Sequence, residues 1–257
     1  MRRAWAVGLL FVLGSFLHRM ALAELTVVER GLPETDVLLI GEQHDAPSHQ
    51  RFHREVIEDL AAQGRLAAVA IEMAEQGAST ATLPRDASES AVQAALRWQD
   101  TAWPWQAYGP ALMAAVRAGV PVIGANLPRS QLRTAMANAS LDSLLPGPAL
   151  KTQQRAIRTG HCDLLPESQI VPMTRVQIAR DLAMASVLAR HHVAGKTVLL
   201  LAGEGHVDSA IGVPQHLHPK LRVRAIAPLP EPPQKDYCED MRRQLKPAPA
   251  GATITPS

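Results

Sequence analysis

The sequence predicts an α/β protein with a parallel central sheet, helices on both faces and an inserted helical lobe over the carboxyl ends of the strands. Short apolar runs rich in Val, Ile and Leu are typical of strands buried on both faces. Segments with helical spacing alternate with these runs, as a parallel sheet requires. Two stretches, 80–103 and 129–170, are too long for simple crossovers and carry helical patterns, which predicts the lobe.

Five runs are expected to form the sheet. Each is short and ends near glycine or a polar residue. The first four are wholly apolar, and the fifth is a weaker candidate because it is interrupted by a charge. The runs are 37–40, 67–71, 120–123, 198–202 and 223–226.

Three helices are expected between these strands. In the segment 48–63, apolar side chains recur every fourth residue after a serine that could cap the helix. The segment 106–118 ends at Gly119, the expected position of a helix C-terminal glycine. Pro172 is expected to open a long helix over 173–192, because proline is favoured in the first helical turn.

The N-terminal segment is expected to direct export. Arg2 and Arg3 precede an apolar stretch, 6–17, that is too short to span a membrane comfortably. The Ala-Leu-Ala sequence at 21–23 is typical of a signal-peptidase site, so we expect removal of residues 1–23 and a periplasmic or secreted protein. No cysteine follows the apolar stretch, so no lipid attachment site is expected.

The remaining chain is expected to form one domain over 24–230 and a C-terminal segment over 231–257, with a disordered Pro-rich tail after about residue 246. Cys162 and Cys238 are the two cysteines of the chain. In an oxidising compartment they would form one disulfide, although two unrelated buried thiols remain the alternative. The net charge of +2 and the absence of a basic aromatic stretch give no indication of nucleic-acid binding.

A short motif, Gly-Glu-x-His, follows two of the apolar runs directly. It occurs at 41–44 and again at 203–206. In open α/β sheets the ligand site lies beyond the carboxyl ends of the strands, so the two motifs are expected to share one cleft. Two other runs also end at polar residues, Glu72 and Asn126.

The acids and imidazoles of this cleft predict either a divalent metal site or an acid–base pair that activates water. The candidate metal ligands are Glu42, His44, Glu72, Glu204 and His206. The candidate catalytic residues are Glu42, His44, Glu72 and His206. The alternative is that each glutamate caps a helix or bonds neighbouring loop amides.

Aromatic residues gather at 98–108 and form either a packed corner or a wall for a large flat ligand. The cluster contains Trp98, Trp103, Trp105 and Tyr108. His161 lies in a loop that could reach the same region. Tyr108 and His161 are side chains of types that ligate iron.

Two helical patterns carry further candidates. His49 and His53 are four residues apart and therefore share a helix face; we expect one near the rim of the cleft and the other in solvent. Gln177, Arg180 and Asp181 lie on one stripe of the long helix. They are expected either to hold the loops at the strand ends or to form a solvated face.

At these residues the chain resembles the ChaN-like haem-binding family of the Tiki/erythromycin-esterase superfamily. The similarity spans about residues 37 to 215. Its motifs are Gly41-Glu42-Gln43-His44-Asp45, Ile71-Glu72-Met73, Trp105 with Tyr108-Gly109-Pro110, Ile123 to Arg129, His161-Cys162, Gln177 with Arg180-Asp181, and Ala202 to His206 with Gly212-Val213-Pro214.

The resemblance implies an exported haem-binding protein of iron acquisition, with haem held near the aromatic segment at a dimer interface. It implies haem as cofactor, a homodimer and an outer-membrane haem uptake system as partner. It transfers cofactor-binding roles to Tyr108, His161 and Trp105. The wider superfamily implies an alternative, a metal-dependent hydrolase that uses the Glu and His residues at the strand ends.

Overall fold

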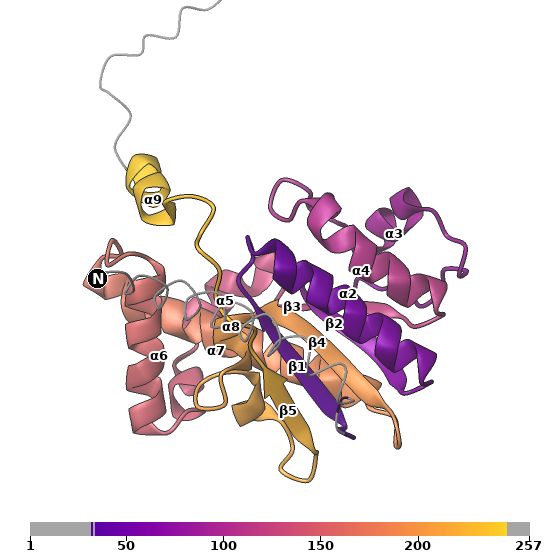
Figure 1. Cartoon of the computed structure of the whole chain (residues 1–257). Helices are drawn as coiled ribbons and strands as arrows, with labels where there is room; N and C mark the ends of the chain where they lie inside the picture. Colours follow the sequence, from indigo (N-terminus) through magenta and orange to yellow (C-terminus); the bar gives the residue numbers. More distant parts are fainter. Residues whose placement is uncertain (1–31, 33, 246–257) are drawn as a thin grey trace, which may run out of the picture.

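The computed structural model describes Leu32 and residues 34–245 (Figure 1). The expected signal peptide and the expected tail after about residue 246 lie outside these residues. Within the described part of the chain, no helix has the length and apolar character needed to cross a membrane.

The core of the molecule is one five-stranded sheet, as predicted. All its strand pairs are parallel and their order is β3-β2-β4-β1-β5. The strands are β1 (Val37–Glu42), β2 (Leu66–Glu75), β3 (Val122–Asn126), β4 (Thr197–Gly203) and β5 (Val223–Ile226). Strand β2 extends four residues beyond its predicted end, so Glu72 lies inside the strand and not after it.

Helices cover both faces of the sheet (Figure 1). On one face α2 (Pro47–Ala62) and α4 (Trp105–Arg117) share a core with β1, β2 and β4. On the other face α7 (Glu167–His191) packs on the same strands through a second core. Four of the five strands are thus buried on both faces, which explains why the runs at their centres are wholly apolar.

Two predicted helix starts were wrong. Helix α7 begins at Glu167, so Pro172 lies inside it instead of opening it. The earlier turn forms because Ile170 is buried there at 2% exposure, which extends the apolar face past the proline. Helix α2 begins at Pro47, not at Ser48, and the backbone N–H of Ser48 donates to the Glu231 carboxylate.

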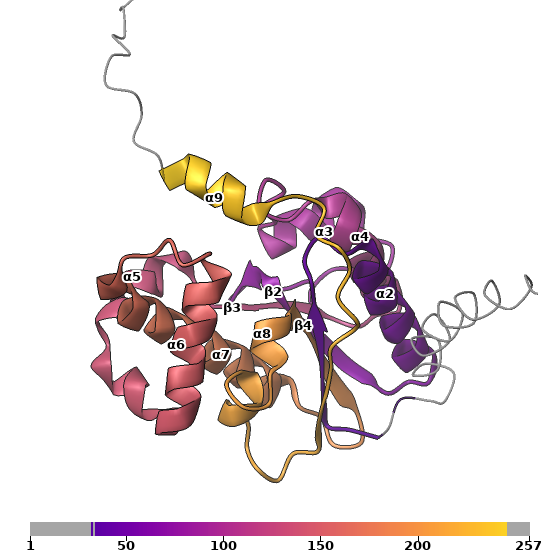
Figure 2. The same ribbon diagram turned by 60° about the vertical axis from the view of Figure 1, so that its left-hand side comes forward.

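The inserted helices flank the carboxyl ends of the strands (Figure 2). On one side lies α3 (Glu89–Leu96), which packs on α4. On the other side α5 (Leu132–Ala137) packs on α7 and shares a small third core with it, and α6 (Gly147–Gly160) also contacts α7. The short helix α8 (Glu204–Val207) follows β4 directly.

The C-terminal segment returns across the strand ends. We call residues 227–236 the C-terminal strap; it leads from β5 to α9 (Tyr237–Leu245) and passes α2 and the loop after β1 (Figure 2). The backbone N–H of Gln234 donates to Asp45, and the carbonyl of Leu229 contacts His49 at 3.0 Å. The predicted disulfide is confirmed in this structure: Cys162 and Cys238 are bonded, with 5.6 Å between their Cα atoms.

Candidate functional site

The two Gly-Glu-x-His motifs lie side by side and interlock. Strands β1 and β4 are neighbours, with Glu42 paired to Gly203 in the register. A Cβ on Gly41 would lie 2.6 Å from a methyl group of Val207, and a Cβ on Gly203 would lie 2.9 Å from Nε2 of His44. Gly41 therefore makes room for Val207, which directly follows the second motif, and Gly203 makes room for His44 of the first motif.

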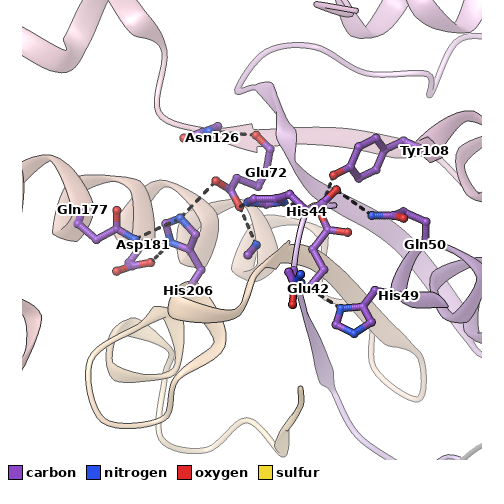
Figure 3. Close-up of polar contacts among 12 residues, drawn as sticks. Glu42, His44, His49, Gln50, Glu72, Tyr108, Asn126, Gln177, Asp181 and His206 are labelled. Atoms are coloured by element: carbon purple, nitrogen blue, oxygen red, sulfur yellow. Dashed lines mark hydrogen bonds and ion pairs between the residues drawn. The ribbon is translucent and has the colours of Figure 1, made fainter. Parts of the chain in front are cut away.

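Glu42 is the centre of the first half of the site (Figure 3). The Tyr108 hydroxyl donates to its Oε1 at 2.7 Å, and Nδ1 of His44 contacts the same oxygen at 2.6 Å. Nδ1 of His53 lies 3.5 Å from its Oε2. Burial opposes the charge on Glu42, but the hydrogen bond with His44 and the charges of the histidines lower its pKa below the ordinary value.

Glu72 is the centre of the second half. The backbone N–H of Gly203 donates to its Oε2 at 2.7 Å, and Nε2 of His206 lies 3.4 Å from its Oε1. His206 Nδ1 contacts Asp181 at 2.5 Å. Burial would lower the pKa of His206, but the charges of Glu72 and Asp181 raise it to about 10. Burial raises the pKa of Asp181 to about 6.

His44 joins the two halves, since its Nε2 lies 3.9 Å from Glu72 while its Nδ1 bonds to Glu42. The four residues expected to share a cleft are therefore brought together. Only His44 presents much of its side chain to solvent, at 40% exposure, whereas His206 shows 6%. The connected groups, in order, are Tyr108, Glu42, His44, Glu72, His206 and Asp181.

The structure gives the expected metal site no support. The carboxylates of Glu42 and Glu72 are bonded to imidazoles, to a phenol and to a backbone N–H. Glu204 is exposed at the start of α8 and joins neither half. Among the described residues no group of three or more His, Cys, Asp or Glu side chains is arranged to hold a metal ion.

The long helix supports the strand ends, which was one of two expected roles for its polar stripe. Gln177 Nε2 lies 3.1 Å from Nδ1 of His206, and Asp181 is fully buried against the same ring. Asn126, after β3, donates from Nδ2 to the backbone oxygen of Glu72 at 3.0 Å.

The expectation for the histidines of α2 was wrong. Neither is solvated: His49 is 2% exposed and His53 is 1% exposed. Nδ1 of His49 accepts from the N–H of Gln43, and Nε2 of His49 contacts the Leu229 carbonyl. The His49 ring is covered by the loop after β1 and by the C-terminal strap, whereas the His53 ring lies beside the buried Glu42. Local sequence reveals neither contact.

The aromatic cluster forms a packed corner. The rings of Trp98 and Trp105 meet edge to face at 5.2 Å, and Trp103 meets Tyr108 at 6.0 Å. Trp105 is only 8% exposed, and its Nε1 donates to Glu89. Trp103 also meets the His44 ring at 4.7 Å, so this corner forms one wall of the cleft.

Tyr237, the second tyrosine of the chain, was not among the residues predicted from the sequence. It is 45% exposed, whereas Tyr108 is 2% exposed with its hydroxyl committed to Glu42. Tyr237 precedes Cys238 and His161 precedes Cys162, so the disulfide brings these two residues to the same part of the surface. In the sequence, the position of Tyr237 directly before Cys238 was the sign that a disulfide could bring it close to His161.

Three cavities meet at His44. The largest, about 930 Å³, runs along Trp103, Pro104 and Gln50 to Tyr237. A second, about 500 Å³, lies over the two motifs and also reaches Tyr237. The third, about 570 Å³, lies between the two insertions and is walled by Trp103.

A sequence profile of the family described as "Haem-binding uptake, Tiki superfamily, ChaN" matches residues 28–217. The chain belongs to this ChaN-like haem-binding family. The solved structure described as "Cofacial heme binding to ChaN of Campylobacter jejuni" is similar to this chain, with 23% identity and a TM-score of 0.64. The similarity covers 82% of this chain and 85% of that one, and it bears out the α/β fold.

No curated protein that was compared matches the chain. The ChaN-like match includes both Gly-Glu-x-His motifs, the aromatic corner and the polar stripe of α7. It ends at residue 217, before the C-terminal strap and Tyr237. Membership of the ChaN-like family therefore supports haem as the cofactor, and the C-terminal segment lies outside the matched residues.

Proposed function

We propose that this protein binds haem in the cleft at the strand ends, as an exported protein of haem and iron uptake. The observation that carries the proposal is the cavity of about 930 Å³ between Trp103 and Tyr237. Ligand pockets of proteins have this size and combine apolar walls with a few polar groups. The ring of Trp103 provides the apolar wall, and the Tyr237 side chain stands at the edge. Membership of the ChaN-like family supports haem as the ligand.

For the iron ligand we propose Tyr237, with His161 beside it. A tyrosine oxygen is an established ligand of haem iron, and it must reach the metal directly. Tyr237 is accessible and lines two of the three cavities. Burial of Tyr237 and its hydrogen bond with Asp45 raise its pKa to about 12, so the free protein holds the phenol neutral. Tyr108 was the iron ligand expected from the sequence, but its hydroxyl would have to break its hydrogen bond with Glu42 to bind iron.

The test is a titration of the mature protein with hemin, followed by visible spectroscopy. The wild-type protein is expected to give the spectrum of a ferric tyrosinate complex. Tyr237→Phe should lose this spectrum, while Tyr108→Phe should keep it, since each change removes one oxygen and opens almost no cavity. If Tyr108→Phe loses the spectrum and Tyr237→Phe keeps it, the ligand assignment is reversed.

The same samples separate haem binding from the hydrolase alternative. If hemin binds no more tightly than to an unrelated protein of similar charge, haem binding is refuted. A metal-stimulated hydrolytic activity lost in both His44→Ala and His206→Ala would then support the alternative. We do not favour that alternative, because the groups it needs are bonded to one another.

The proposal also includes the cell location and partners of the protein: it is exported, forms a homodimer and works with an outer-membrane haem uptake system. The basic residues, apolar stretch and Ala-Leu-Ala site of the N-terminal segment support export. A disulfide also fits an oxidising compartment. N-terminal sequencing of the protein from the periplasmic fraction should find a chain that begins near Glu24. A chain in that fraction that begins at Met1 would contradict cleavage.

A further inference from the structure

The third cavity is set apart by its arginines, and we call it the arginine pocket. It has a volume of about 570 Å³ and lies beyond the ends of β2 and β3, between the two helical insertions. Arg97 approaches from the end of α3, Arg129 from the segment after β3, and Arg180 from α7. Three elements that are distant in sequence thus bring guanidinium groups to one cavity.

Within the described residues these three arginines stand apart from the ion pairs of the protein. No Asp or Glu oxygen in that part of the chain forms an ion pair with any of them, although seven other arginine and lysine side chains there do form ion pairs. The carboxylates that line the pocket are Glu72 and Glu75. Glu72 is paired with His206, and Glu75 accepts from the backbone N–H of Arg129. Because three arginines line the pocket against these two carboxylates, the lining carries an excess of positive charge.

Two buried polar atoms at the pocket lack a hydrogen-bond partner within the described residues. They are Nε of Arg180, which is a donor, and Oδ1 of Asn126, which is an acceptor. Buried polar groups are nearly always paired, and these two unpaired atoms belong to residues that line the same cavity. Nδ2 of Asn126 is held by the backbone of Glu72, which fixes its Oδ1 in place.

The rest of the lining is apolar. The walls include Met73, Leu96, Trp103, Leu127 and Leu132. Leu96 comes from the same insertion as Arg97, and Leu127 and Leu132 come from the other side of the cleft. A ligand that fills the cavity would thus bury an apolar body while its charged end meets the arginines.

We propose that the arginine pocket binds the carboxylate of an organic acid with an apolar body. Arg180 pairs with the carboxylate, Arg97 and Arg129 add positive charge, and Asn126 accepts from a hydroxyl, amide or acid proton of the ligand. The carboxylate can belong to a free small acid, or to the propionates of haem in the neighbouring cavity. With a free acid as the ligand the proposal is independent of haem binding, and with the propionates it rests on the proposed function.

The first arm of the test uses calorimetry with 3-phenylpropionate, and with 3-phenylpropionamide as the uncharged control. The acid should bind and the amide should not. Arg180→Gln should weaken binding of the acid by about tenfold or more, because a buried charge-assisted contact is lost. Asn126→Asp should weaken it as well, because it places a like charge beside the ligand. Arg224→Gln, on the opposite edge of the sheet in β5, is the matched control and should change nothing.

The second arm compares hemin with its dimethyl ester in the same solvent. If haem supplies the carboxylate, hemin should bind more tightly than the ester, and Arg180→Gln should remove the difference. A positive result in the first arm supports binding of a free acid, and a positive result in the second arm supports binding of the haem propionates. The proposal is overturned if 3-phenylpropionate does not bind and the difference in affinity between hemin and its ester is the same in Arg180→Gln as in the wild type. A thermal midpoint for each variant separates loss of binding from loss of folding.

Discussion

At the scale of single residues, the surroundings of each buried histidine decide whether it is charged. His206 and His53 are both almost fully buried, and burial alone lowers the pKa of each. His206 lies between Glu72 and Asp181, whose charges raise its pKa to about 10. His53 has Glu42 at 3.5 Å and no hydrogen-bond partner among the described residues, and its pKa falls to about 4.

His53 should therefore make the protein less stable in acid. Between pH 6.5 and 4 the unfolded chain binds a proton that the folded chain excludes, so the free energy of unfolding falls as the pH falls through this range. Between pH 7.5 and 5 this loss should be about 2 kcal/mol greater in the wild type than in His53→Gln. Urea denaturation at the two pH values measures it.

The matched control for this prediction is His218→Gln, at an exposed histidine. It should keep the full pH dependence of the wild type. Equal pH dependence in the wild type and in His53→Gln would show that His53 is not neutral in the folded protein.

Some residues of this site could be placed from the sequence and others could not. Glu42, His44 and His206 could be assigned to one cleft because each lies at or just beyond the carboxyl end of a buried strand. The burial of His49 could not be inferred, since it depends on a C-terminal strap about 180 residues later in the chain, and His53 is buried beside Glu42, which belongs to another element. Helical spacing shows which side chains share a face and leaves open what covers that face.

At the scale of elements, the contact between β1 and α8 depends on the absence of a side chain at Gly41. In Gly41→Ala the new Cβ would lie 2.6 Å from the Val207 methyl and 3.2 Å from the backbone of Glu204. We expect a loss of about 1–3 kcal/mol in unfolding free energy, which is typical of overpacking. Chemical denaturation of the variant measures this loss.

A double variant tests the cause. Val207→Ala removes the methyl group that the new Cβ would meet, so Gly41→Ala with Val207→Ala should be more stable than the sum of the two single losses predicts. Additive losses would mean that the strain lies elsewhere, for example at the backbone of Glu204.

The disulfide links α9 to the loop after α6 and closes a loop with a sequence separation of 76 residues. In the chain-entropy account, such a loop stabilises the folded state by about 4 kcal/mol. Cys162→Ser with Cys238→Ser should therefore lower the thermal midpoint and leave α9 with faster amide exchange than the sheet. Non-reducing mass spectrometry of the wild type should find the two cysteine peptides joined, and two alkylatable thiols would contradict the structure.

The elements themselves differ in how well sequence predicts them. The first four strands were predictable because their runs are wholly apolar, and β5, despite the charge of Arg224, was found with the same bounds that the structure shows. Pro172 was misleading, because buried contacts of Ile170 stabilise a helical turn before it. The pairing of Cys162 with Cys238 followed from composition, but its placement of Tyr237 beside the cleft required the fold.

At the scale of the whole molecule, the C-terminal segment completes a cleft whose floor belongs to the sheet. The floor carries His44, and Tyr237 reaches the rim only through the strap and the disulfide. Truncation before the strap would remove one wall of the largest cavity. The family match ends at residue 217, so the part of the chain that reaches the rim lies outside the matched residues.

Haem bound in this cleft should promote dimerisation. The cavity is open to solvent beside Tyr237, which is 45% exposed, and Leu229 in the strap is 51% exposed. A planar apolar ligand with one face against Trp103 would leave its other face in water, and a second copy of the complex could bury it. Sedimentation velocity should show a larger dimer fraction with hemin than without, at equal protein concentration. In Tyr237→Phe the increase should need more hemin, because the iron contact is lost while the apolar faces remain. A hemin complex that stays monomeric at all protein concentrations would show that one subunit covers the ligand alone.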